Sequence, residues 1–148
     1  MRHVTEPNLT DSHWIEIDGC QGEGGGQMVR SSLTLSMVTG KPVRIVNIRA
    51  GRDKPGLMRQ HLTCVQAAAE VSRAKVTGDK LGSTAISFEP QAVVAGEYHF
   101  RIGTAGSASL VVQTLLPASK PARKQLSNFF RSQCTVKDGQ IIHKPNIT

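Results

Sequence analysis

The chain has 148 residues, which is enough for one ordinary domain with a hydrophobic core. Its formal net charge is +7, but six of the 18 Lys and Arg residues follow Ala118, where Asp138 is the single acidic residue. The rest of the chain is nearly neutral, so the overall charge is weak support for nucleic-acid binding. No apolar run approaches the ~20 residues of a membrane span, and three cysteines without metal-ligand spacing favour a cytoplasmic protein with reduced thiols.

The predicted elements alternate between strands and helices. Residues 1–13 have no apolar signal-peptide region and are predicted to form a flexible leader. Trp14–Asp18 alternates in polarity, as a half-buried strand does, and glycine-rich Gly19–Gly26 leads into a helix over Gln27–Thr39. Four more elements follow: a strand apolar on both faces over Val43–Ile48, a helix over Leu57–Val71, and strands over Thr84–Glu89 and Tyr98–Ile102.

This order predicts an α/β fold in which helices pack on a sheet. The pattern then restarts, because Gly103 and Gly106 follow Gly19 and Gly22 by the same 84 positions and Leu110–Leu116 is helical in pattern. We therefore predict a domain over residues 14–117, with a first unit at about 14–97 and a second begun at about 98. Residues 118–148 are predicted to be a divergent basic tail, which leaves the second unit without its sheet partners.

The glycine-rich segment has two interpretations. Its backbone amides, with the positive end of the following helix dipole, could bind an anion. In that case Glu23 is better suited to hold Mg²⁺ or Mn²⁺ than to contact phosphate directly. The alternative is a tight strand-to-helix turn. The segment lacks the Gly-Lys-Ser/Thr of a Walker loop, and Gln27 stands where the dinucleotide fingerprint has its third glycine.

A second segment, Arg49–His61, gathers four cations and a single acidic residue, Asp53. Arg49 directly follows a predicted central strand, at the end of a sheet where open α/β folds bind ligands. Arginine binds phosphate with two planar hydrogen bonds, so we favour a phosphate site over a solvated basic loop. His61 falls on the apolar face of its helix and is predicted to be a core residue. No nucleophile or general base can be assigned from spacing.

Three stretches together carry a family resemblance: GCQGEGGGQMVR, IRAGRDKPGLMRQHL and IGTAGSASLVVQTLLPA. In this order they resemble the RNA 3′-terminal phosphate cyclases over about residues 15–118. The resemblance implies repeated βαβαββ units, as in enolpyruvyl transferases, and an RNA-processing ligase that uses ATP and Mg²⁺ or Mn²⁺. In that family a histidine takes AMP from ATP and passes it to the RNA 3′-phosphate. The neighbouring 2′-hydroxyl then closes a 2′,3′-cyclic phosphodiester.

The resemblance also implies roles for particular residues. Glu23 is similar to the family's glutamate near ATP and metal, and Arg30 to an active-site arginine that also contacts the nucleotide. Arg49, Arg52 and Gln60 resemble the set that contacts phosphates and substrate, with Gln60 also counted among the nucleotide contacts. Gln113 resembles an ATP-contacting glutamine, and RNA with a 3′-phosphate end is the implied partner.

The chain also departs from the family pattern. The family's histidine nucleophile lies near the C-terminus, in sequence that this chain does not have, so we expect a truncated form with weak or no activity alone. The tail after Pro117 is either native or the product of a frameshift. Uncovered apolar surface would favour self-association. The alternative function is a non-catalytic, cyclase-like scaffold that binds RNA.

Overall fold

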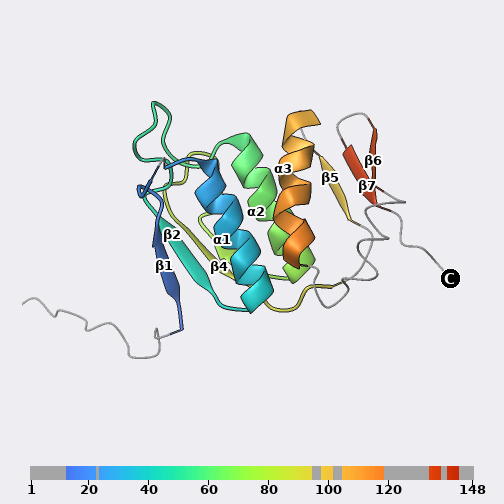
Figure 1. Ribbon diagram of the computed structural model, residues 1–148, viewed down its shortest axis with the longest axis horizontal. Coiled ribbons are helices and arrows are strands. Elements are labelled where there is room, and N and C mark those ends of the chain that lie inside the picture. The colour runs from blue at the N-terminus through green and yellow to red at the C-terminus, as the bar shows by residue number, and fades with distance from the viewer. Residues whose placement is uncertain are drawn as a thin grey trace, which may run out of the picture.

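The computed structural model describes residues 13–22, 24–94, 98–101, 105–118, 134–137 and 140–143, and it forms two sheets and three helices (Figure 1). In chain order the elements are β1 (Ile15–Asp18), α1 (Gly26–Thr39), β2 (Val43–Val46), α2 (Arg59–Ser72), β3 (Lys75–Thr77), β4 (Ile86–Glu89), β5 (His99–Arg101), α3 (Ala105–Leu115), β6 (Cys134–Lys137) and β7 (Gln140–His143). The predicted α/β class is therefore confirmed. No helix in the described part of the chain is both long and apolar enough to cross a membrane.

The larger sheet has the strand order β1–β2–β4–β3. Strands β1 and β2 are parallel neighbours joined through α1, whereas β4 runs antiparallel to both β2 and β3. Because β1 and β2 are parallel, both strands end at the same edge of the sheet. The glycine-rich loop after β1 and the arginine-rich loop after β2 therefore start side by side.

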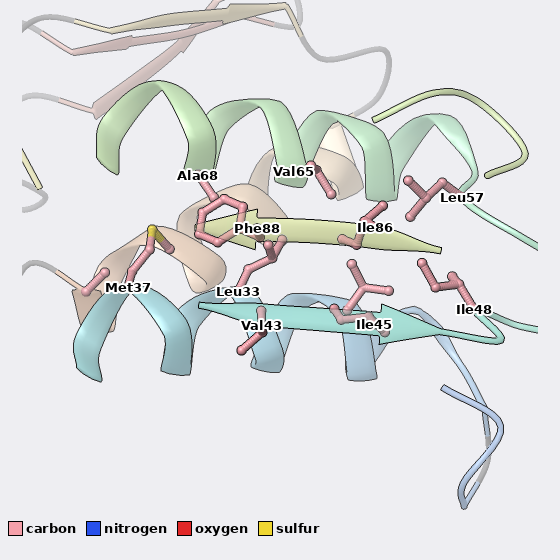
Figure 2. Packing of buried hydrophobic residues seen from close by; sticks show 12 residues of the cluster. Leu33, Met37, Val43, Ile45, Ile48, Leu57, Val65, Ala68, Ile86 and Phe88 are labelled. Atoms are coloured by element: carbon pink, nitrogen blue, oxygen red, sulfur yellow. The ribbon is translucent and has the colours of Figure 1, made fainter. Parts of the chain in front are cut away.

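One hydrophobic core holds α1 and α2 against the same face of this sheet (Figures 1 and 2). Leu33 from α1 and Val65 from α2 meet Ile45 and Phe88 from the two central strands, and all four side chains are fully buried. Burial of such side chains contributes on the order of 2 kcal/mol each. The helices are thereby fixed relative to the edge of the sheet from which both loops emerge.

The predicted strand over Val43–Ile48 differs from the observed one in length and in polarity. Strand β2 ends at Val46, with Val43 and Ile45 buried and the alternate residues Arg44 and Val46 half-buried. The expectation of two apolar faces is wrong because the helices lie against only one face of the sheet. On the other face Arg44 contacts the ring of Trp14 and hydrogen-bonds to Ser87.

Three other differences lie in the second half of the chain. Strand β3, three residues long, was not predicted, because it follows α2 without a glycine or proline. Helix α3 begins at Ala105, five residues before the predicted helical segment Leu110–Leu116. Strand β5 pairs antiparallel with β7, so the expectation that the second unit has no sheet partner within the chain is wrong. The predicted leader, residues 1–13, lies outside the described residues except for His13.

Candidate phosphate-binding site

The two loops are joined where they leave the sheet. The amide of Gly19 donates to the Val46 carbonyl at 2.8 Å, and a Cβ on Gly19 would lie only 3.0–3.2 Å from the backbone of residues 46–48. Asp18 Oδ1 accepts hydrogen bonds from the Cys20 amide at 3.0 Å and from Asn47 Nδ2 at 3.1 Å. These bonds to the Cys20 amide and to Asn47 lower the pKa of Asp18. An ionised carboxylate thus ties the glycine loop to the arginine loop.

The glycine loop presents the uncapped N-terminus of α1. Gly22 and Gly24 adopt left-handed backbone angles, with φ of 65° and 55°, which glycine adopts without strain. The N-cap residue is Gly25, which has no side chain to accept the first amides of the helix, and no acidic residue occupies the first turn. These amides and the positive end of the helix dipole form an arrangement suited to an anion. Glu23, the predicted metal ligand, lies outside the described residues.

The arginine loop is held in shape by one of its own arginines. Arg49 has a left-handed φ of 54°, and its Nη1 donates to the carbonyls of Lys54 at 2.8 Å and Gly56 at 3.1 Å. Backbone hydrogen bonds of 2.9 Å also join Ile48 and Leu57 to residues 83–84, just before β4. Arg49 was predicted as a phosphate contact, and the structure shows that it braces the loop that carries Arg52.

Arg52 brings the two predicted segments together. A Cβ placed on Gly25 would lie 3.5 Å from Arg52 Nη2, so the guanidinium borders the space that a side chain on Gly25 would occupy. Arg52 is exposed, and its amide donates to the Arg49 carbonyl at 3.0 Å. An arginine therefore stands beside an uncapped helix N-terminus, and both favour the same negative charge.

His61 lies between the same two segments, in the first turn of α2. Its side chain is 3% exposed, which confirms the predicted burial. Nδ1 accepts the amide of Met58 at 3.1 Å, and the other edge of the ring faces Gly26. Burial, followed by the positive charges of Arg49 and Arg30, lowers the pKa of His61 to about 4. The imidazole is therefore neutral near pH 7. Its position at the site could not be inferred from the apolar pattern of the helix.

Two predicted nucleotide contacts share a hollow between α1 and α3. Arg30 and Gln113 both line this space, which has a volume of about 370 Å³. Arg30 Nη2 donates to Gln27 Oε1 at 2.7 Å, and Thr34 Oγ1 donates to the Thr114 carbonyl at 2.8 Å across the two helices. The structure therefore brings together two residues that are far apart in the sequence.

Gln60 lies beside His61 in α2. Its side chain is exposed, and its Nε2 is 3.4 Å from His61 Nε2. Among the residues that the structure describes, no three His, Cys, Asp or Glu side chains gather as a metal site would require. Glu23 remains a predicted metal ligand.

Comparison with known proteins finds relatives of this chain in one family. A family model described as RNA 3′-terminal phosphate cyclase matches residues 21–134, more than half of the chain. The match extends beyond Ala118, where the sequence resemblance was expected to end. A protein named RNA 3′-terminal phosphate cyclase from Ralstonia nicotianae is 66% identical over 104 residues, 70% of this chain and 30% of that protein. One of the same name from Koribacter versatilis is 62% identical over 110 residues, 74% of this chain and 31% of that protein.

We expect acid to destabilise the fold through His61. In the folded chain the pKa is about 4, below the ordinary 6.5, so between these values the unfolded chain binds more protons. This contribution to the free energy of unfolding is present above pH 6.5 and falls by roughly 3 kcal/mol as the pH drops to 4. Urea unfolding of the wild type and of His61→Asn, measured across this range, isolates the effect. Equal pH dependence of the two proteins would contradict the assignment.

Proposed function

The chain belongs to the RNA 3′-terminal phosphate cyclase family, and we propose that its two converging loops bind the 3′-terminal phosphate of RNA and the phosphates of ATP. The observation that carries this proposal is the position of Arg52 beside Gly25 at the start of α1. Helix amides supply several aligned donors, and the guanidinium supplies a planar pair of donors with a full positive charge. A doubly charged terminal phosphate suits this combination better than a neutral ligand.

In this proposal each group has its own task. Arg52 and the first amides of α1 hold the phosphate and stabilise charge on the transferring phosphorus. Arg49 contributes positive charge and keeps the loop rigid through its bonds to Lys54 and Gly56. Gln60 binds substrate from the start of α2. Arg30 and Gln113 hold the nucleotide in the hollow between α1 and α3.

The proposed reaction converts an RNA 3′-phosphate into a 2′,3′-cyclic phosphodiester at the expense of ATP. AMP is transferred from ATP, which releases pyrophosphate, and reaches the 3′-phosphate. The 2′-hydroxyl oxygen then loses its proton and bonds to that phosphorus, and AMP leaves. The described residues contribute binding and orientation, which hold the phosphate still while the 2′-hydroxyl approaches.

We propose that Mg²⁺ or Mn²⁺ takes part in this reaction, with Glu23 as a protein ligand. Such an ion prefers oxygen ligands and would neutralise phosphate charge beside a carboxylate. Of the described carboxylates, Asp18 lies nearest in sequence to the loop, and its Oδ1 is already bonded to Cys20 and Asn47. Phosphate oxygens and water would supply the remaining ligands.

The chain spans about a third of the length of the curated relatives that it matches. The resemblance places the histidine that accepts AMP outside the matching segment, so we propose that these residues alone bind phosphate and cyclise RNA weakly or not at all. We expect no labelled protein and no cyclic ends after incubation with α-labelled ATP, metal and a 3′-phosphorylated RNA. Appearance of either product in a folded sample would mean that a histidine of this chain accepts AMP.

The binding proposal is tested with two RNA oligonucleotides that differ only in a 3′-phosphate or 3′-hydroxyl end. We expect tighter binding of the phosphorylated RNA and a loss of about tenfold or more in Arg52→Ala, because bonds to charged groups contribute ~1.5–3 kcal/mol. Lys75→Ala, which removes the same charge from exposed β3, serves as the matched control and should bind like the wild type.

Fluorescence anisotropy at several salt concentrations measures both affinities. Equal affinity for the two RNA ends, with a steep salt dependence and no effect of Arg52→Ala, would contradict the phosphate site. That outcome would instead favour the non-catalytic RNA-binding scaffold.

A further inference from the structure

The first turns of α1 and α2 meet at the imidazole of His61. A Cβ on Gly26, the first residue of α1, would lie 2.0 Å from His61 Nε2 and 2.5 Å from Cδ2. Real side chains do not approach so closely, so the ring edge occupies the space that a side chain on Gly26 would need. The glycine is required here for close approach between the two helices.

The opposite edge of the ring is fixed to α2. Nδ1 accepts the amide of Met58, the N-cap residue, at 3.1 Å. An accepting Nδ1 carries no proton, so the proton of the neutral ring is on Nε2, the atom that faces Gly26. Gln60 Nε2 lies 3.4 Å from this atom and is itself a donor, so the two nitrogens do not hydrogen-bond to each other in this tautomer. One edge of the imidazole thus caps the N-terminus of α2, and the other edge packs against α1.

The surrounding charges explain why a neutral imidazole suits this place. The guanidinium groups of Arg30, on α1, and Arg49, on the arginine loop, both act on the ring, and a buried cation between them would be repelled. A phenyl ring would fill the same space but leave the Met58 amide without its acceptor. A neutral histidine supplies a hydrogen-bond acceptor for Met58 and a flat ring edge for Gly26 without adding a positive charge.

We propose that His61 is a positioning residue whose imidazole sets the distance between the glycine loop and the arginine loop. The contribution of His61 to catalysis rests on the proposed phosphate site. The coupling of the two loops through His61 does not depend on that site. A single side chain thereby holds the first amides of α1, Arg52 and Gln60 in register for one ligand.

The wild-type protein tests the geometry without any substitution. NMR spectra of the ¹⁵N-labelled imidazole at pH 7 should show a neutral His61 ring with its proton on Nε2. A charged ring, or a proton on Nδ1, would overturn the proposal because Met58 could not then donate to that atom.

A double-mutant cycle tests the coupling in the absence of ligand. Gly26→Ala should shift the backbone amide NMR signals of residues 49–56, through the displaced ring. In a His61→Ala background the same substitution should leave those signals nearly unchanged, because the methyl group enters vacated space. Additive shifts in the two backgrounds would overturn the proposal. If Gly26→Ala alone fails to fold, a folded double variant supports the proposal. If His61→Ala folds and the double variant does not, the proposal is overturned.

Binding of 3′-phosphorylated RNA is the second readout of the same cycle. Gly26→Ala should weaken binding about tenfold in the wild type and less than about twofold in the His61→Ala background. His61→Asn, which keeps an acceptor near Met58, serves as the conservative variant and should bind more tightly than His61→Ala. If the wild type does not prefer the phosphorylated RNA, the proposed function fails, and the ligand-free signals still decide the role of His61.

Discussion

Parallel pairing of β1 with β2 is the constraint on which the site depends. Because of this pairing, two loops leave the sheet at the same edge. The lack of a side chain on Gly19 allows the backbones of these loops to approach closely. The Asp18–Asn47 hydrogen bond then fixes one loop to the other. The helices that follow both loops are held by a shared core, so their N-termini cannot separate without disturbing buried residues such as Leu33 and Val65.

Several local features of this edge are unfavourable without a ligand. Arg49 adopts a left-handed conformation, α1 begins without a side-chain cap, and positive side chains surround a neutral histidine. Such features cost free energy and tend to gather at functional sites, where the surrounding structure holds them in place. A phosphate would accept hydrogen bonds from the uncapped amides and be attracted by the arginine charges beside them, and these two attractions are the physical basis of the proposed function.

The sequence predicts the fold better than the contacts within the site. Long periodic segments revealed α1 and α2, whereas the short β3 and the early start of α3 were missed because small residues and short strands carry little pattern. The glycine and arginine segments were predicted, and the sheet places them together. The roles of Asp18 and Asn47, the bracing bonds of Arg49 and the contact between His61 and Gly26 depend on tertiary packing. A helix pattern identified His61 as buried but could not show which neighbour it touches.

In the proposed site the glycine loop and the arginine loop bind one ligand together. An NMR titration of the chain with a short 3′-phosphorylated RNA tests it most directly, by following the backbone amides of Gly25 and Gly26 and the side-chain Nε–H of Arg52. All three signals should move along one binding curve with this RNA and remain still with the 3′-hydroxyl RNA. Separate binding curves, or movement of Arg52 alone with either RNA, would contradict it.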